Sequence, residues 1–300
     1  MIRVITDSTS SIPEEIRTEL GIQVVSLSIN HGDHSFLEAE ADLDAFYQDI
    51  YDFIDNIPTS SQPSPQRIAE VLSDAAAAGD PVLGVFISDR WSGTFNTVCQ
   101  LAEEVATRFP GFQYALVNSL ANCMELGLAA IAGAEAARDG ASLDDCLAAT
   151  LRSLDNSRIL FSPESLRFLE AGGRIGKAAA LIGNMISICP ILTVVDGEAT
   201  DLAKARSHKK AMSRMVKVMQ EDAQAAGGLH NVAVHYIGSR DVAEQWAKDA
   251  IDPILGRPAI LCPASPVIGV HVGPAVGIAY ECNGPVKDKH VSARPEVVRS

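Results

Sequence analysis

Val82-Leu83-Gly84-Val85-Phe86-Ile87-Ser88 is an unbroken apolar run that ends in a hydroxyl. A strand without a polar face is typical of a parallel sheet that helices cover on both sides. Strand-like runs at residues 3–7 and 113–117 alternate with helical stretches at residues 65–78 and 92–109. This alternation predicts a doubly wound α/β domain with a mainly parallel sheet.

The pattern changes near residue 157, after which short strands and helices follow in mixed order. Asp196-Gly197 separates two strand-like stretches and predicts a β-hairpin, because this pair adopts positive φ at low cost. Further strands are expected at residues 259–261, 267–270 and 276–281. We therefore expect an α/β protein with a doubly wound N-terminal domain, a C-terminal α+β domain and a polar tail, at residues 1–157, 158–285 and 286–300.

The composition is that of a globular protein: 300 residues, 47% hydrophobic and 21% charged. Lys and Arg number 24 against 38 Asp and Glu, a net charge of −14, so no nucleic acid is expected as a partner. The six cysteines include no C-x-x-C pair, which favours a reducing compartment and argues against a metal site. The first residues do not resemble a signal peptide, so we expect a cytoplasmic protein.

Two uncharged or nearly uncharged segments, residues 178–195 and 258–280, reach the length of about 18 residues that a membrane span requires. Prolines and glycines interrupt both segments, so buried strands and a core helix explain them better. We expect at most transient contact with a membrane.

Two hydroxyl-rich loops precede predicted helices. One is Ser60-Ser61-Gln62-Pro63-Ser64-Pro65, and the other contains Ser92-Gly93 directly after the apolar run. Ligands of open α/β sheets bind outside the carboxyl ends of the strands, so the loops are candidates for one shared crevice. The alternative is that Ser64 and Ser92 act only as helix N-caps.

His271 lies in the most apolar stretch of the chain, where a histidine is more often a core residue than a ligand contact. Together with the two serine loops it would also suit a serine hydrolase, although no G-x-S-x-G motif is present. Gly172-Gly173-Arg174 follows no strand and is therefore not a dinucleotide fingerprint. We expect the glycines to end a helix and to display Arg174 on a tight turn.

Five segments together resemble the DegV family of bacterial fatty-acid-binding proteins. In chain order they are Ser60-Ser61-Gln62-Pro63-Ser64-Pro65, Trp91-Ser92-Gly93-Thr94-Phe95, Leu169-Glu170-Ala171-Gly172-Gly173-Arg174-Ile175, Lys204-Ala205-Arg206-Ser207 and His271-Val272-Gly273-Pro274. The opening Thr6-Asp7-Ser8-Thr9-Ser10 also matches. Each motif is weak alone, but together they span the chain to about residue 281.

The resemblance implies a two-domain protein that buries one fatty acid between its domains and serves as the lipid-carrying subunit of a fatty acid kinase. It implies that Ser60, Ser61, Ser92 and His271, with the Gly93 N–H, hold the carboxylate. It also places Arg174 and Arg206 near the mouth, where the kinase would bind. No metal or other cofactor is implied, and the acyl phosphate formed by the kinase would enter phospholipid synthesis.

The sequence departs from the family pattern in several places. Ser60 stands where threonine is common, Trp91 where leucine is usual, and Phe95 where tyrosine is usual. Trp91 is expected to narrow the pocket near the carboxylate. Asn122-Cys123 also deviates from the pattern, which leaves the function of that wall unassigned.

We expect a non-catalytic carrier of a long-chain fatty acid that presents the carboxylate to an ATP-dependent kinase. A carrier for another apolar carboxylate fits the same residues. The alternative from a different class is an esterase or acyl-transfer enzyme that uses Ser92 or Ser60 with His271.

Overall fold

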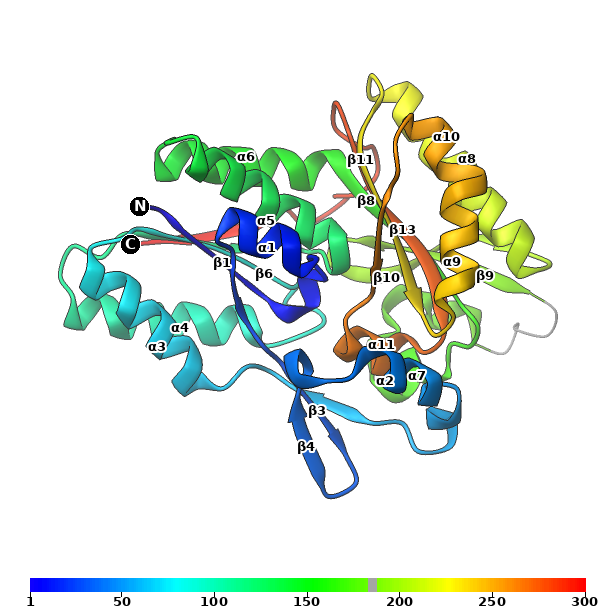
Figure 1. Ribbon diagram of the computed structural model, residues 1–300, viewed down its shortest axis with the longest axis horizontal. Coiled ribbons are helices and arrows are strands. Elements are labelled where there is room, and N and C mark those ends of the chain that lie inside the picture. The colour runs from blue at the N-terminus through cyan, green and yellow to red at the C-terminus, as the bar shows by residue number, and fades with distance from the viewer. Residues whose placement is uncertain (183–187) are drawn as a thin grey trace.

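A computed structural model describes residues 1–182 and 188–300 of the chain. Within these residues the strands form a five-stranded, a six-stranded and a three-stranded sheet. Figure 1 shows the five-stranded sheet with its helices on one side of the molecule and the six-stranded sheet on the other. The predicted α/β class is therefore confirmed.

The five-stranded sheet contains the apolar run that opened the sequence analysis. Its strand order is β14-β7-β6-β1-β2. All pairs among its first four strands in chain order are parallel, as expected, and all five residues of β6 are buried. The strands are β1 (Arg3–Asp7), β2 (Gln23–Val25), β6 (Val82–Phe86), β7 (Tyr114–Asn118) and β14 (Glu296–Arg299).

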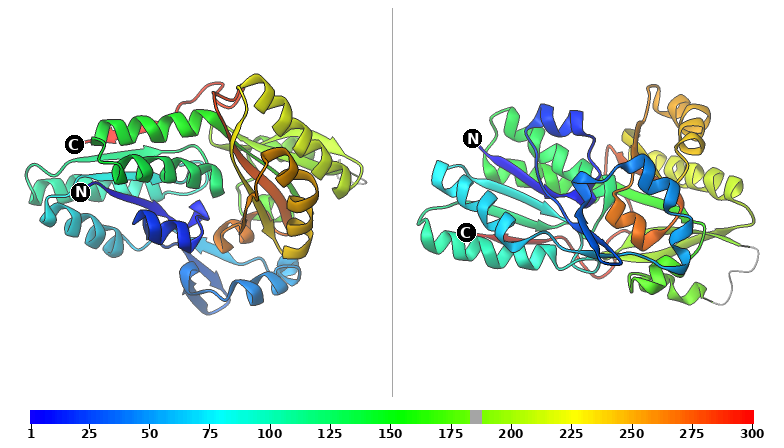
Figure 2. Two further views of the ribbon diagram at one scale, coloured as in Figure 1. Left: turned by 45° about the horizontal axis from the view of Figure 1, so that its top comes forward. Right: turned by 60° about the horizontal axis from the view of Figure 1, so that its bottom comes forward.

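Helices cover both faces of this sheet (Figures 1 and 2). The pair α3 and α4 lies on one face, and the pair α5 and α6 lies on the other. Proline at the first helical position begins α3, and Gly79 in the left-handed region ends it. The helices are α1 (Glu14–Leu20), α3 (Pro65–Ala78), α4 (Thr94–Arg108), α5 (Cys123–Arg138) and α6 (Leu143–Asn156).

A small antiparallel sheet, in the order β4-β3-β5, projects below the junction of the two larger units in Figure 1. The alternating stretch at residues 22–29 divides between β2 and β3, which belong to different sheets. The elements are β3 (Ser28–His31), β4 (His34–Leu37), β5 (Thr59–Ser61), α2 (Leu43–Asp49) and the 3-10 helices η1 (Ser8–Ser10), η2 (Glu38–Glu40) and η3 (Asp52–Asp55).

The six-stranded sheet has the order β10-β9-β8-β13-β11-β12, with antiparallel pairs except for β11 and β12. Its strands are β8 (Ser157–Pro163), β9 (Cys189–Val195), β10 (Glu198–Ala205), β11 (Leu229–Ile237), β12 (Ile260–Pro263) and β13 (Ala275–Cys282). Its helical elements are α7 (Arg167–Ala171), η4 (Gly176–Leu181), α8 (His208–Ala225), α9 (Arg240–Trp246), η5 (Ala247–Ile251), α10 (Asp252–Leu255) and α11 (Pro266–Val272).

The expected strand at residues 267–270 is wrong, because these residues belong to helix α11. Ser265 caps this helix by accepting a hydrogen bond from the Ile268 N–H, and Pro266 occupies its first turn. All seven residues of α11 are buried. A helix buried on all sides shows no amphipathic period, which explains why the sequence suggested a strand.

The predicted hairpin at Asp196-Gly197 is confirmed as the turn between β9 and β10. Part of the apolar segment at residues 178–195, namely residues 183–187, lies outside the described residues. The predicted Ser64 cap is not formed, since the Ser64 side chain accepts no hydrogen bond at the start of α3.

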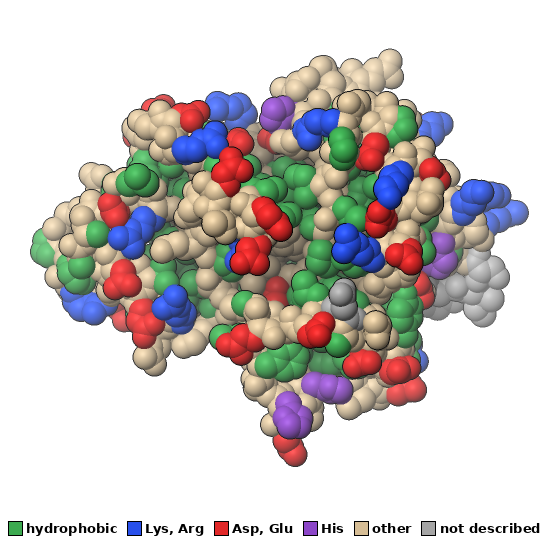
Figure 3. Space-filling view, viewed as in Figure 1, with side chains coloured by type: hydrophobic (Ala, Val, Ile, Leu, Met, Phe, Trp, Pro, Cys, Tyr) green, Lys and Arg blue, Asp and Glu red, His purple; other side chains and the backbone are tan. Residues whose placement is uncertain are grey.

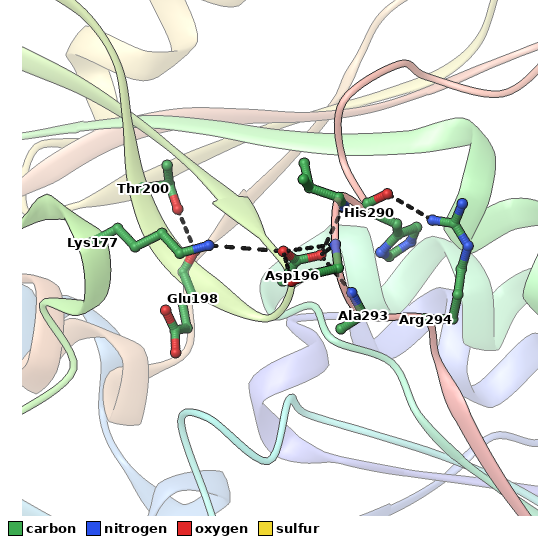
Figure 4. Close-up of polar contacts among 9 residues, drawn as sticks. Lys177, Asp196, Glu198, Thr200, His290, Ala293 and Arg294 are labelled. Carbon is green, nitrogen blue, oxygen red and sulfur yellow. Dashed lines mark hydrogen bonds and ion pairs between the residues drawn. The ribbon is translucent and has the colours of Figure 1, made fainter.

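The final segment, expected as a polar tail, crosses back to the five-stranded sheet and ends in β14, which pairs with β7. Figure 4 shows how the hairpin turn holds this segment. The Asp196 carboxylate accepts hydrogen bonds from the backbone N–H groups of residues 291–293 at 2.8–3.1 Å. Burial opposes ionisation of Asp196, but these bonds outweigh it and lower its pKa. The final segment therefore joins the two large sheets.

Candidate functional site

Ser60 and His271 meet where the small sheet packs against α11. Figure 1 shows β3 and α11 at the junction below the two large sheets, and α11 contacts β3, β5 and α7. The Ser60 Oγ lies 2.7 Å from His271 Nε2. Because neighbouring residues of a strand point to opposite faces, Ser61 points away, and its Oγ accepts a hydrogen bond from Asn30 Nδ2 at 2.9 Å.

The environment of His271 keeps the imidazole neutral. Burial, followed by the nearby Arg174 charge, lowers the pKa of His271 to about 4. Its Nδ1 is buried without a hydrogen-bond partner among the described residues. A Cβ on Gly172 would lie only 2.4 Å from this Nδ1, so the close approach of α7 to the imidazole requires a glycine.

The Ser92-Gly93 loop supplies further hydrogen-bond donors. Gly93 stands at the N-cap position of α4, where the helix dipole favours negative charge. The Ser92 Oγ lies 2.9 Å from Thr94 Oγ1 and accepts a hydrogen bond from the Thr94 N–H at 3.3 Å. Ser92 therefore contributes to the start of the helix while its hydroxyl borders the same pocket as Ser60.

Arg174 borders this pocket as well, a closer position than the sequence suggested. As expected, the two glycines end α7, and Gly173 adopts a positive φ of 69°. The Arg174 Nε then donates to the Trp91 carbonyl at 3.0 Å, and its Nη1 donates to the Gly172 carbonyl. These bonds hold the guanidinium beside His271.

These residues enclose what we call the polar pocket, a cavity of about 180 Å³. Its polar lining is Ser60, Gln62, Ser92, Gly93, Arg174 and His271. Within the described residues, the lining contains one arginine and no acid. Hydroxyl groups, a helix N-terminus and a guanidinium all favour a bound anion, and a planar guanidinium matches a carboxylate well.

An adjoining cavity, which we call the apolar chamber, is small and has a volume of about 30 Å³. Trp91 and Ile268 line both cavities, so the chamber and the polar pocket are neighbours that share these two side chains. Most of its wall is apolar, with contributions from β8, α11 and β13, including Phe161, Val272 and Val276. The linings of the polar pocket and the apolar chamber match the chemistry of an amphipathic molecule with one anionic end.

Two of the expected site residues lie elsewhere. Ser61 points to the opposite face of β5, and Arg206 is exposed in the bend between β10 and α8. Neither residue lines the polar pocket or the apolar chamber. Trp91 lines both cavities, and its expected narrowing of the pocket near the carboxylate stays a prediction.

The part of the chain that the structure describes contains no group of three or more His, Cys, Asp or Glu side chains that could hold a metal ion. Among the same residues, no helix is both long and apolar enough to cross a membrane. The face shown in Figure 3 has Lys and Arg interspersed with Asp and Glu.

A third cavity, of about 420 Å³, was not expected from the sequence and is lined by Ser8, Arg17 and the buried Glu38, among others. Burial, with a contribution from the Asp7 charge, raises the pKa of Glu38 to about 8, although hydrogen bonds from Ser265, Val267 and Ser8 oppose the shift. Glu38 is therefore protonated at neutral pH in the folded state. Glu38 was not identified from the sequence, because its burial depends on contacts with distant segments.

The raised pKa of Glu38 predicts how stability depends on pH. In the unfolded chain Glu38 ionises near pH 4.5, but in the folded protein it ionises near pH 8, so stability falls as the pH rises through this window. Glu38→Gln is expected to flatten this dependence and to raise the melting temperature at pH about 8 by a few degrees. The exposed Glu40→Gln is the matched control and should behave like the wild type. Identical pH profiles of melting temperature for Glu38→Gln and the wild type would contradict the assignment.

Comparisons with known proteins agree with the geometry. A family model described as "Uncharacterised protein, DegV family COG1307" matches residues 1–283. A DegV domain-containing protein of Clostridium acetobutylicum is 40% identical over 285 residues, which are 93% of this chain and 97% of that relative.

Two solved structures are similar over nearly the whole chain. A DegV family protein from Thermus thermophilus, described as binding a fatty acid, has a TM-score of 0.80 and 30% identity, covering 93% of this chain and 99% of its own. DegV of Bacillus subtilis, described as a fatty acid binding protein, has a TM-score of 0.82 and 26% identity, covering 94% and 99%.

Proposed function

Because this chain belongs to the DegV family, we propose that it binds one long-chain fatty acid, with the carboxylate in the polar pocket and the hydrocarbon chain in the apolar chamber. The observation that carries the proposal is that Trp91 and Ile268 line both cavities, which makes the polar pocket and the apolar chamber neighbours. An anion-binding pocket beside an apolar chamber matches the two ends of a fatty acid, and the apolar side chains around the chamber would move apart to admit the hydrocarbon chain. The solved relatives described as fatty acid binding support the same ligand class.

In this proposal the carboxylate is held by Ser60, Ser92 and His271, with the Gly93 N–H and the Arg174 guanidinium. If His271 carries its proton on Nε2, it donates to the Ser60 Oγ, and the Ser60 hydroxyl is then free to donate to the carboxylate. Each methylene buried in the apolar chamber contributes about 0.8 kcal/mol, so the hydrocarbon chain supplies most of the affinity.

We propose that the protein is a carrier rather than a hydrolase, although Ser60 and His271 form a close pair. In a serine hydrolase the second ring nitrogen of the histidine donates to an acid that orients it. Here no acid lines the polar pocket within the described residues, and His271 Nδ1 has no partner there. A histidine whose pKa is about 4 is also a poor general base at neutral pH.

The carrier would present its carboxylate to an ATP-dependent kinase in the cytoplasm, and the acyl phosphate formed there would enter phospholipid synthesis. The family resemblance suggests this step. The exposed Arg206 is the proposed contact with the kinase, because it lies outside both cavities and remains available to a partner.

Tryptophan fluorescence tests the binding proposal, because Trp91 lies between the two cavities and the second tryptophan, Trp246, lines neither. Titration with a long-chain fatty acid is expected to change the emission and to saturate at one molecule per chain. The fatty alcohol of equal length, which lacks the carboxylate, should bind at least tenfold more weakly. Equal affinity for acid and alcohol would contradict the assignment of the polar pocket.

A further inference from the structure

The wall of the apolar chamber contains one polar side chain that the proposed function leaves unexplained. Asn122 lines the chamber but not the polar pocket, and it is only 3% exposed. Its Nδ2 has no hydrogen-bond partner in the described part of the chain. Leaving a buried amide unpaired is unfavourable and uncommon in folded proteins, so this group requires an explanation.

The neighbouring polar groups do not satisfy the Asn122 amide. Asn122 stands at the N-cap position of α5, yet its side chain makes no capping bond. His235 also lines the chamber, but its Nε2 accepts the Met124 N–H at 3.1 Å and its Nδ1 lies 3.6 Å from Cys262 Sγ. Burial lowers the pKa of His235 to about 4, so this imidazole is neutral and occupied.

The Asn122 amide determines which chemical groups could be its hydrogen-bond partner. A carboxamide has a donor and an acceptor, and a plain methylene chain offers neither. A hydroxyl group can accept from Nδ2 and can also donate to Oδ1, so it pairs with the amide in either orientation. The N-terminus of α5 adds a local preference for an acceptor oxygen.

On the basis of the proposed function, we propose that the preferred ligand is a fatty acid with a hydroxyl group on its chain, which Asn122 binds. Trp91 and Ile268 line both cavities, whereas Asn122 lines only the chamber. The hydroxyl therefore lies along the chain, away from the carbon next to the carboxylate. Asn122 is then a specificity-determining residue.

The test uses the wild-type protein and displacement of a fluorescent fatty acid. The competitors are stearic acid and hydroxystearic acids with the hydroxyl next to the carboxylate, in the middle of the chain or near its far end. At least one acid of the middle or far group is expected to bind about tenfold more tightly than stearic acid, equivalent to one hydrogen bond to a buried amide. The acid hydroxylated next to the carboxylate should show no such gain.

Two variants test whether the Asn122 amide causes the preference for a hydroxylated fatty acid. Asn122→Leu is expected to bind stearic acid at least as tightly as the wild type and to lose the preference for the hydroxylated acid. Thr150→Val is the matched control, because it also removes a buried polar atom without a partner but lies outside the chamber. It should keep the preference.

Other outcomes overturn the inference. If stearic acid binds to the wild type as tightly as every hydroxylated acid, the inference is wrong and the proposed function remains. If none of the acids displaces the probe, both are wrong. The affinities of the wild type for these acids decide between the outcomes even if Asn122→Leu does not fold.

Discussion

Lys289→Met is expected to lower the free energy of unfolding by about 3–5 kcal/mol, the cost of leaving a buried charge without its partner. Lys289 is 2% exposed and Glu125 is fully buried, and the Lys289 Nζ lies 2.6 Å from Glu125 Oε1. The Lys289 Nζ also donates to the Leu154 carbonyl. Chemical denaturation followed by circular dichroism measures the change as a lower midpoint.

The double variant Glu125→Leu/Lys289→Met removes both charges and should recover most of the lost stability, because no unpaired charge then remains. Lys177→Met is the matched control. Lys177 is half exposed and lies 3.8 Å from Asp196, so its loss should change the free energy of unfolding by no more than about 0.5 kcal/mol. An unchanged midpoint for Lys289→Met would mean that the final segment does not dock as described.

Arg174→Met is expected to weaken fatty-acid binding by about tenfold to a hundredfold, because it removes the one charged group in the described lining of the polar pocket. The binding of the fatty alcohol of equal length should change less than twofold, since an alcohol carries no charge. Displacement of a fluorescent fatty acid measures both affinities.

Arg206→Met is the matched control for charge, because Arg206 is exposed and lines neither cavity. It should bind acid and alcohol like the wild type. Arg174 also donates hydrogen bonds to Trp91 and Gly172, so a purely structural role would weaken acid and alcohol equally. That result would contradict a direct contact between Arg174 and the carboxylate.

Local sequence patterns correctly predicted those strands and turns that depend mainly on neighbouring residues. The unbroken run at residues 82–88 became a parallel strand buried on both faces, and Asp196-Gly197 became a hairpin turn. Helix α11 was not predicted, because a completely buried helix shows no amphipathic period in its sequence. In β5 the side chains of Ser60 and Ser61 point to opposite faces of the strand. The direction of each hydroxyl cannot be predicted unless these residues are known to form a strand.

Contacts between distant segments could not be predicted. The Glu125–Lys289 pair joins α5 to the final segment, which lies beyond the matched family region, and no local pattern indicates such a pairing. The contact of Arg174 with Trp91 could not be predicted for a similar reason, because it depends on how two units of the fold pack. The unpaired amide of Asn122 became visible only with the chamber that it lines.

Native mass spectrometry of the purified protein, followed by denaturing extraction of the bound molecule, tests whether the protein carries a fatty acid. We expect a mass excess of one fatty acid per chain and a free carboxylic acid in the extract. An empty protein in which Ser60 or Ser92 reacts covalently with a serine-directed phosphonate would contradict this expectation and would indicate a hydrolase.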